Sequence, residues 1–326
     1  MTAAPRVSVI LNCYNHQDYV GEAIDSVLRQ THRDLELIII DNGSTDGTRK
    51  VIQSFSDERI KLFLHDENQS LSTRLNQGVA AAKGQFVAVL YSDDWMLPDK
   101  LERQVALFET LGPEYGVVYS PALAVNQLSG ARWQHISMAR DDATLATLLR
   151  HSYEGAIDMS SPLIRRECLD RYRWYDDLFG DGEGVLMRIA MRWKFRFDPN
   201  PTVVLRDHGR NMGKATQINH DALMVLLDRL EDHRDFPKDC AGPLKQFRAD
   251  ACYMNAWATL RVCGPADWAR TQLGRAISLR PRLLWKPRVV AAIGLAAVPG
   301  SIRKLLNRVG DKLTDRPENR AFVESF

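Results

Sequence analysis

The chain has 326 residues, of which 45% are hydrophobic and 26% are charged, and both fractions are ordinary for a globular protein. Its formal net charge of +2 argues against nucleic acid as a partner, because bulk nucleic-acid binding needs a strongly basic surface. The five cysteines are odd in number and include no Cys-x-x-Cys pair, so we expect reduced thiols, without a disulfide framework or a zinc site.

No segment of the sequence predicts secretion or a membrane span. The first six residues lack the apolar stretch of a signal peptide and lead directly into an expected strand. The longest apolar stretch, 289–298, is far shorter than the ~20 residues that cross a bilayer. We therefore expect a cytoplasmic protein, and a peripheral position on the inner face of the cell membrane is the alternative left open.

Short β-branched runs alternate with stretches of helical spacing along the first 120 residues. The expected strands are 7–11, 35–40, 60–64, 86–90 and 117–120, and the expected helices are 19–29, 45–55, 70–82 and 100–111. This alternation predicts an α/β fold with a mostly parallel central sheet and helices on both faces.

The second half of the chain changes from this pattern to helices alone. Between 127 and 153 the pattern is weak, and we expect a variable loop and a helix there. The last elements of the α/β pattern are a helix at 183–192 and a strand at 202–205. Three further helices are expected at 220–230, 244–262 and 266–279. The sequence thus predicts an α/β domain over 1–212 and a helical extension over 213–326.

Acidic clusters follow two of the expected strands. Asp41-Asn-Gly-Ser-Thr-Asp46 comes after the second strand, and Ser92-Asp-Asp94 comes after the fourth. In an open α/β sheet, ligands bind outside the carboxyl ends of the strands. Carboxylates at that edge suit a ribose, the edge of a base, or a divalent cation that holds phosphate oxygens.

These clusters belong to a series of motifs in a fixed order. The series comprises 7–15 (VSVILNCYN), 24–31 (IDSVLRQT), 41–48 (DNGSTDGT), 68–76 and Ser92-Asp-Asp94 with Pro98. It resembles the inverting family-2 glycosyltransferases with the GT-A fold, closely over 7–101 and more loosely to about His208. Each motif is weak alone, but five in the right order and spacing are a specific signal.

The resemblance implies that a nucleotide-diphosphate sugar, UDP- or dTDP-linked, lies across the strand tips of the half spanning 1–115. Tyr14 resembles the residue that packs near the base, Asp41 the carboxylate that binds the base imide, and Arg74 a contact to base or phosphate. Asp93 corresponds to the ribose position and Asp94 to the ligand of Mg²⁺ or Mn²⁺. The alternatives are packing for Tyr14, a turn cap for Asp41, a surface ion pair for Arg74 and a helix cap for Asp94.

The half spanning 116–212 is expected to supply the general base and to bind the acceptor. An inverting transfer needs a carboxylate that removes the proton of the acceptor hydroxyl. The segment 179–188 resembles the family's acidic motif, with Asp181 as the first candidate for the base and Glu183 as the second. His208 lies in a segment that resembles the Arg-x-His end of the catalytic domain, so it is a candidate for the metal or diphosphate, with a structural role as the alternative. His16, His32 and His65 carry no motif and are expected at the surface.

The C-terminal region is basic and partly apolar. The segment 279–306 combines basic residues, Trp285, Pro287 and a short apolar helix, which predicts contact with an anionic membrane surface. The alternative is a helix that packs on the catalytic domain.

Together these features favour an inverting glycosyltransferase that acts on a glycan or lipid-linked acceptor in surface polysaccharide assembly. The first alternative is an inactive protein that binds sugar nucleotides or acts as a scaffold. A nucleotidyltransferase is less favoured, because no Gly-rich basic loop follows the first strand.

Overall fold

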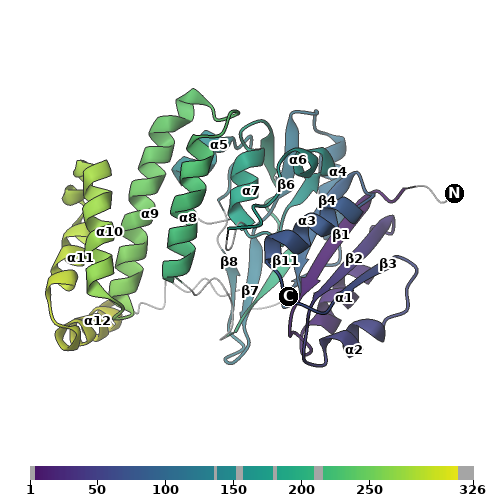
Figure 1. Cartoon of the computed structure of the whole chain (residues 1–326), viewed down its shortest axis with the longest axis horizontal. Coiled ribbons are helices and arrows are strands. Elements are labelled where there is room, and N and C mark those ends of the chain that lie inside the picture. The colour runs from purple at the N-terminus through teal and green to yellow at the C-terminus, as the bar shows by residue number, and fades with distance from the viewer. Residues whose placement is uncertain (1–3, 136–137, 152–156, 179–181, 209–215, 315–326) are drawn as a thin grey trace. The chain divides into compact units, whose positions relative to one another are not determined.

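The computed structural model describes residues 4–135, 138–151, 157–178, 182–208 and 216–314. The chain divides between residues 209 and 210 into two compact units (Figure 1). The boundary predicted from the sequence, between 212 and 213, lies three residues further along the chain. The first unit contains the sheets, and the described part of the second unit is helical.

A seven-stranded sheet forms the centre of the first unit, with the strand order β10-β6-β9-β4-β1-β2-β3. Neighbouring strands are parallel except at β9, which runs antiparallel to both β4 and β6. The sheet is therefore mostly parallel, as the sequence predicted. Its strands are β1 (Val7–Cys13), β2 (Leu35–Asn42), β3 (Ile60–His65), β4 (Phe86–Tyr91), β6 (Tyr115–Tyr119), β9 (Leu163–Arg165) and β10 (Lys194–Phe197).

The strands in the middle of this sheet are buried on both faces. Every residue of β2 is buried, and most of its side chains are Leu or Ile, as expected for a parallel strand covered by helices on both faces. Helix α3 can pack closely on β1 because Gly78 has no side chain: a Cβ atom there would lie 2.5 Å from Ile10. The helices of this unit are α1 (Val20–Leu28), α2 (Thr48–Gln53), α3 (Leu71–Ala81), α4 (Lys100–Glu109), α5 (Leu145–His151), α6 (Arg166–Arg171) and α7 (Gly182–Ile189).

A smaller sheet, in the order β5-β11-β7-β8, completes the first unit. Its strands are β5 (Trp95–Met96), β7 (Ala122–Asn126), β8 (Arg132–His135) and β11 (Val203–Asp207). Because β5 directly follows the second acidic cluster and pairs with β11, the sheet brings residues near 93 and near 207 together. The sequence predicted β11 but none of the other three strands.

The second unit is built around a helical hairpin. Helices α9 (Ala241–Arg261) and α10 (Ala266–Leu279) were both predicted, and their core includes small side chains such as Ala256 and Ala269, which allow close packing. The other elements are α8 (Thr216–Glu231), η3 (Lys238–Cys240), η4 (Pro281–Trp285), α11 (Pro287–Ala297) and α12 (Gly300–Thr314). Among the residues that the structure describes, no helix combines the length and apolar character needed to cross a bilayer.

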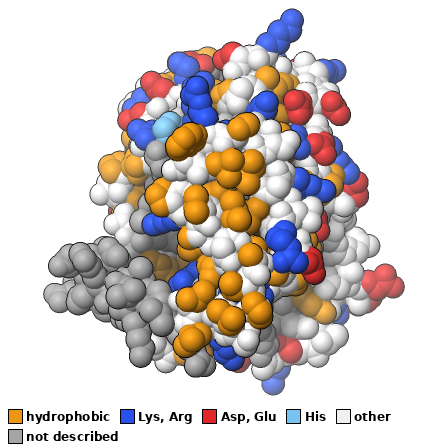
Figure 2. Space-filling view, turned by 90° about the vertical axis from the view of Figure 1, so that its left-hand side faces the viewer, with side chains coloured by type: hydrophobic (Ala, Val, Ile, Leu, Met, Phe, Trp, Pro, Cys, Tyr) orange, Lys and Arg blue, Asp and Glu red, His pale blue; other side chains and the backbone are white. Residues whose placement is uncertain are grey.

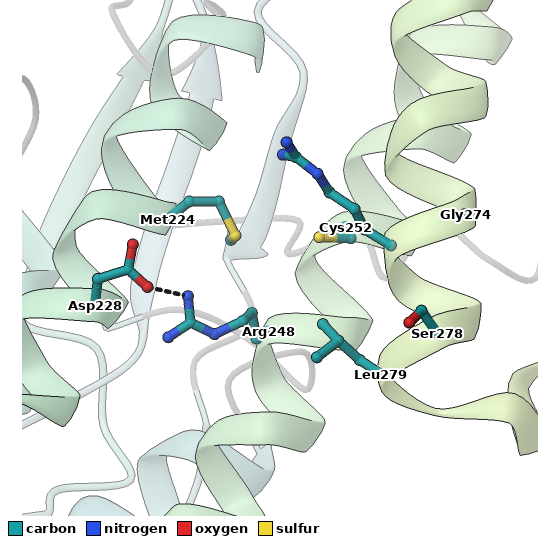
Figure 3. A pocket seen from close by; sticks show the side chains of 8 residues that line it. Met224, Asp228, Arg248, Cys252, Gly274, Ser278 and Leu279 are labelled. Carbon is teal, nitrogen blue, oxygen red and sulfur yellow. Dashed lines mark hydrogen bonds and ion pairs between the residues drawn. The ribbon is translucent and has the colours of Figure 1, made fainter.

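Two surface features belong to this second unit. On one face, hydrophobic side chains form a broad band (Figure 2). A cavity of about 610 Å³ lies between α8, α9 and α10 (Figure 3). Arg248 in its wall is paired with Asp228 at 2.5 Å and with Glu231 at 3.1 Å, so its charge is already balanced.

Candidate functional site

The carboxyl ends of three central strands lie side by side at one edge of the large sheet. Strand β1 pairs with β2 on one side, where Cys13 is opposite Asp41, and with β4 on the other, where Asn12 is opposite Tyr91. The loops that follow these strands therefore meet at the same edge. The two acidic clusters share this edge, as the sequence predicted.

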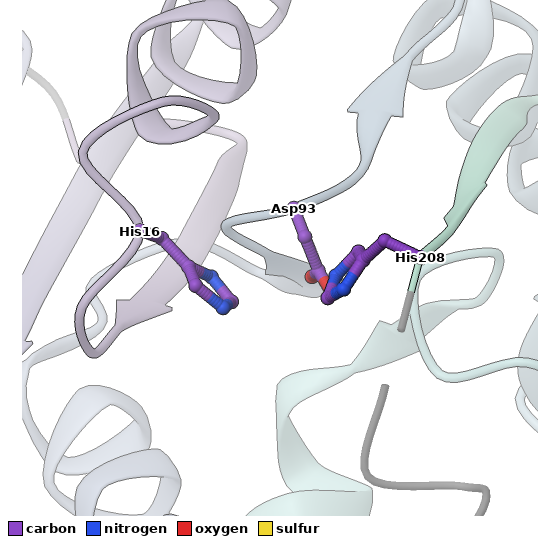
Figure 4. Close-up of side chains that lie close together, drawn as sticks. All are labelled: His16, Asp93 and His208. Carbon is purple, nitrogen blue, oxygen red and sulfur yellow. The ribbon is translucent and has the colours of Figure 1, made fainter. Parts of the chain in front are cut away.

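Three potential metal ligands come together at this edge. His16 follows β1, Asp93 follows β4, and His208 follows β11 (Figure 4). One ligand atom from each residue lies within 4.8 Å of the others. Oδ2 of Asp93 is 3.1 Å from Nε2 of His208, and the His208 side chain is almost fully buried. We call this set the His16–Asp93–His208 cluster.

The loop that carries His16 is fastened to its neighbours. Asn15 adopts a φ of 53°, a left-handed conformation that Asn tolerates better than most residues. Its N–H donates to Oγ of Ser44 at 3.0 Å, and its side-chain oxygen accepts from the N–H of Thr45 at 2.8 Å. These bonds fix the loop after β1 against the loop after β2.

His16, expected at the surface, lies instead among these potential metal ligands. The side chain is half-buried, and Nδ1 lies 2.7 Å from Oγ of Ser92, the residue that precedes Asp93. If Nδ1 carries the proton and donates to Ser92, the lone pair is on Nε2, which is the arrangement a metal-ligating imidazole needs. The position of His16 just beyond a strand tip is the sequence signal that could have identified it.

Aromatic and ionic contacts hold His208 in place. The ring of Tyr19 stacks on His208 with centroids 5.3 Å apart and planes 18° apart. The guanidinium of Arg206 lies over the ring of Tyr19, 5.0 Å from its centroid. It also donates to the backbone oxygen of Asp93 at 3.1 Å and pairs with Glu22 at 2.5 Å. Neither Tyr19 nor Arg206 was assigned a site role from the sequence, because their contacts depend on pairing between distant segments.

Asp94, the metal ligand predicted from the sequence, is not a member of the His16–Asp93–His208 cluster. Its carboxylate accepts hydrogen bonds from the N–H of Arg206 at 3.0 Å and from the hydroxyl of Ser160 at 3.1 Å. It does not cap α4 either, since the N-cap residue there is Asp99. Burial, followed by the charges of Asp93 and Asp158, raises the pKa of Asp94 well above its ordinary value. Asp94 thus ties the end of β11 to the loop after β4.

Asp41 is fully buried at the end of β2. Its Oδ2 accepts from Nε of Arg49 at 2.7 Å and from the N–H of Ser44 at 3.2 Å. The hydrogen bond to Asp41 raises the pKa of Arg49. The turn between them needs glycine at Gly43, where φ is +80° and a Cβ atom would lie 2.6 Å from the backbone of Glu67. The other oxygen, Oδ1, lies 4.0 Å from Sγ of Cys13, so the pair with Arg49 does not occupy the whole carboxylate.

Arg74 contacts neutral groups rather than a surface acid. Nε donates to Oδ1 of Asn42 at 2.8 Å, and Nη2 donates to the backbone oxygen of Glu67 at 3.0 Å. Burial lowers the pKa of Arg74. The side-chain amide of Asn42 also bonds Asn68 and Gln69, so Arg74 and Asn42 together order the loop that precedes α3.

The remaining predicted residues lie at the edge of this region or beyond the described part of the chain. Tyr14 follows β1 and is 39% exposed, so its ring is available for contact with a ligand. Asp181 lies outside the described residues. Glu183 lies in the first turn of α7.

The donor atoms of the His16–Asp93–His208 cluster fit a divalent transition metal. Two imidazole nitrogens and a carboxylate oxygen form a mixed set that suits Mn²⁺ better than Mg²⁺, since Mg²⁺ prefers oxygen ligands in octahedral geometry. The hydrogen bond between His16 and Ser92 supplies the outer contact that usually orients such a ligand.

Comparison with known proteins identifies the family of the chain. The family model described as Glycosyl transferase family 2 matches residues 8–172, which is half of the chain. The chain belongs to glycosyltransferase family 2.

Several curated relatives of this family-2 chain match it over part of their length. It is 44% identical over 103 residues to the putative teichuronic acid biosynthesis glycosyltransferase TuaG of Bacillus subtilis, covering 31% of this chain and 41% of TuaG. It is 23% identical over 233 residues to the succinoglycan biosynthesis protein ExoO of Rhizobium meliloti, covering 69% of this chain and 67% of ExoO. In the first three curated relatives, the match covers between a third and a half of their length.

Solved structures confirm the expected GT-A-type fold of this family-2 chain. Residues 1–349 of TarS from S. aureus, in complex with UDP, align with a TM-score of 0.66 and 14% identity over 94% of this chain and 92% of that chain. The mannosyltransferase PcManGT from Pyrobaculum calidifontis, in complex with GDP-Man and Mn²⁺, aligns with a TM-score of 0.59 and 20% identity over 97% of this chain and 89% of that chain.

Proposed function

We propose that this chain is an inverting glycosyltransferase that moves a sugar from a UDP- or dTDP-sugar to a hydroxyl group of a glycan or lipid-linked acceptor in surface polysaccharide assembly. The observation that carries the proposal is the His16–Asp93–His208 cluster at the ligand-binding edge of a family-2 fold. The nucleotide and nucleotide sugar bound in TarS and PcManGT support the class of donor. The polysaccharides in the names of TuaG and ExoO support the class of acceptor.

His16, Asp93 and His208 would hold the divalent cation, and we propose Mn²⁺. When bound, such a cation neutralises the charge that the diphosphate leaving group acquires. The rest of the site fixes the ligands: Tyr19 stacks on His208, and Ser92 orients His16. Asp94 contributes by bonding the N–H of Arg206, which holds the strand that leads to His208.

The nucleotide would lie over the loops after β1 and β2. Tyr14 offers an exposed ring for packing against the base. Arg74 is a buried cation whose described partners, Asn42 and Glu67, contribute neutral oxygens, so an anionic ligand would be favourable beside it. Asp41, which holds Arg49 through Oδ2, would accept the imide N–H of the base.

The general base remains Asp181 in our proposal, with Glu183 as the second candidate. Inversion requires one carboxylate to take the hydroxyl proton of the acceptor while that oxygen attacks the sugar carbon. Glu183 lies in the first turn of α7, which begins at Gly182.

Nucleotide binding tests the metal cluster directly. We expect UDP to bind the full chain in the presence of Mn²⁺, more weakly with Mg²⁺, and at least about tenfold more weakly after Asp93→Asn or His208→Ala. Titration calorimetry with UDP and each metal measures this. His65→Ala is the matched control, because His65 lies outside the cluster and bonds Gln77. An Asp93→Asn protein with unchanged Mn²⁺-dependent binding would refute the cluster.

Substitution of the proposed base should reduce sugar transfer without reducing nucleotide binding. Asp181→Asn is expected to leave UDP binding unchanged and to reduce UDP release in the presence of acceptor by about 10²-fold or more. Glu183→Gln should retain most of the activity. Full activity in Asp181→Asn together with loss in Glu183→Gln would move the assignment to Glu183. A wild-type protein that binds UDP but releases none from any sugar nucleotide would contradict the enzymatic proposal.

A further inference from the structure

Over residues 300–307, where its side chains are described, helix α12 buries two polar side chains and exposes three aliphatic ones. Arg303 and Asn307, four residues apart, are buried. The Asn307 amide donates to the backbone oxygens of Leu260 and Arg261 at the end of α9, both at 2.9 Å. Three aliphatic side chains of the same helix, Ile302, Leu305 and Leu306, are exposed beside Lys304. An ordinary surface helix instead buries its apolar stripe.

Helix α11 is apolar on both sides. It buries Val289, Ala292 and Ala296 against the core of the second unit, and it exposes Val290 and Ile293. No charged residue occurs from Val289 to the end of the helix. A helix that is apolar all round is normally covered on all sides. At 11 residues it is about 16 Å long, too short to cross a bilayer.

The segment before α11 adds an aromatic side chain to the same region. Leu284 is exposed, and Trp285 is 87% exposed, which is unusual for the largest apolar side chain. Tryptophan is enriched where a hydrocarbon layer meets water, because its ring is apolar and its N–H is polar. The consecutive elements η4, α11 and α12 thus expose seven large apolar side chains, which we refer to as the apolar face: Leu284, Trp285, Val290, Ile293, Ile302, Leu305 and Leu306.

The chain segment that carries this apolar face is basic. From Trp268 to Gly310 the sequence contains nine Lys or Arg residues and no Asp or Glu. Arg282, Lys286, Arg288 and Lys304 are exposed next to the aliphatic side chains. Figure 2 shows Lys and Arg side chains beside the hydrophobic band, with a smaller number of Asp or Glu side chains. Long basic side chains at such a border extend toward anionic headgroups while their stems cover apolar surface.

We propose that the apolar face formed by η4, α11 and α12 docks on an anionic phospholipid membrane, with α11 and α12 lying in the plane of the interface. Two properties favour a membrane surface over a protein partner. The apolar side chains are arranged along short helices that can embed only shallowly, and the surrounding charge is complementary to acidic headgroups. A second copy of the chain is disfavoured, since a self-complementary contact would bring two basic borders together. The inference does not depend on the proposed glycosyl transfer.

Vesicle flotation of the full chain tests this proposal. We expect the protein to float with vesicles of phosphatidylcholine and phosphatidylglycerol, and to float much less with phosphatidylcholine alone or at high salt. The double variant Val290→Glu, Ile293→Glu should reduce the partition coefficient by about tenfold or more, because two carboxylates would replace aliphatic groups that enter the membrane on docking. Both positions are exposed, so the fold should be retained, as circular dichroism would check.

Matched variants separate the apolar and electrostatic contributions. Arg282→Gln with Arg288→Gln should reduce binding to the anionic vesicles while leaving the weak binding to phosphatidylcholine as it is. Leu128→Glu is the control, because Leu128 is 93% exposed but lies in the first unit. Absence of flotation, or equal flotation with both kinds of vesicle, would overturn the proposal. So would light scattering that shows an oligomer which the double variant converts to a monomer, since the occupant would then be a second copy.

Discussion

Lys100 is a fully buried lysine behind the candidate site. Its ammonium donates to Oε1 of Gln104 at 2.8 Å and to the backbone oxygen of Ser161. Ser161 follows Ser160, whose hydroxyl bonds Asp94, so Lys100 helps to hold the loop on which Asp94 rests. Burial lowers the pKa of Lys100 from an ordinary value of 10.5 to about 7.

This pKa predicts how stability depends on pH. Between about pH 7 and pH 10, the unfolded chain keeps the Lys100 proton while the folded chain releases it, so the free energy of unfolding should rise with pH. The slope due to Lys100 is at most about 1.4 kcal/mol per pH unit. It vanishes below about pH 7, where Lys100 is protonated in both the folded and the unfolded chain. Lys100→Met should remove this slope. Urea denaturation across that pH range measures it.

An exposed lysine provides the comparison for this experiment. Lys50 lies on α2 and is exposed, so Lys50→Met should leave the slope unchanged. An identical slope in wild type and Lys100→Met would show that Lys100 stays protonated in the folded protein.

Residue roles at the site were only partly predictable from the sequence. The carboxylates near 41 and 93 could be placed at one edge, because the carboxyl ends of parallel strands share that edge. Which of Asp93 and Asp94 faces the cluster could not be predicted. That choice depends on Ser160 and Arg206, which are 66 and 112 positions away from Asp94 in the sequence.

At the scale of elements, long regular segments were predictable and short ones were not. Strand β2 is a continuous buried run, and α10 was predicted with its observed ends, 266–279. Strands β5, β9 and β10 have two to four residues each, too few for a periodic pattern to appear. They form because a neighbouring strand offers hydrogen bonds, which the sequence of the segment alone does not show.

The orientation of α12 could not be predicted either. Its sequence pattern shows an amphipathic helix, but not which side of the helix faces the protein. The Asn307 amide decides this, because it satisfies two backbone oxygens in the last turn of α9, Leu260 and Arg261, that would otherwise lack partners within that helix.

This contact gives a prediction for the element. Asn307→Ala should destabilise the docking of α12 by about 1–3 kcal/mol, because the backbone oxygens of Leu260 and Arg261 both lose the Asn307 amide, and Leu260 keeps only the N–H of Cys263. Hydrogen exchange measured by mass spectrometry should then show faster exchange in α12 and in the last turn of α9. Leu305→Ala is the control on the same helix, since Leu305 is exposed and its truncation should leave exchange unchanged. Unaltered exchange in Asn307→Ala would mean that other contacts hold α12.

At the scale of the whole molecule, the two units have separate hydrophobic cores. One core is formed by β1, β2, β4 and the helices that cover them, and the other by α9, α10 and α11. All residues of the His16–Asp93–His208 cluster belong to the first unit, and all residues of the apolar face belong to the second. Ligand binding and membrane docking can therefore be perturbed one at a time.

Separate cores predict a local response to the nucleotide. A ligand that binds only the folded state stabilises it by RT ln(1 + [L]/Kd), about 2.7 kcal/mol at a hundredfold excess over Kd. With Mn²⁺ and UDP, amide protection should rise in β1, β4 and β11, whose ends carry the cluster, and stay unchanged in α9 and α10. Hydrogen exchange with and without UDP measures both regions in one experiment, and Asp93→Asn is the control that should lose the response. A comparable rise in α9 and α10 would show that the two units unfold as one cooperative system, and the separate design of catalytic and membrane variants would then no longer be justified.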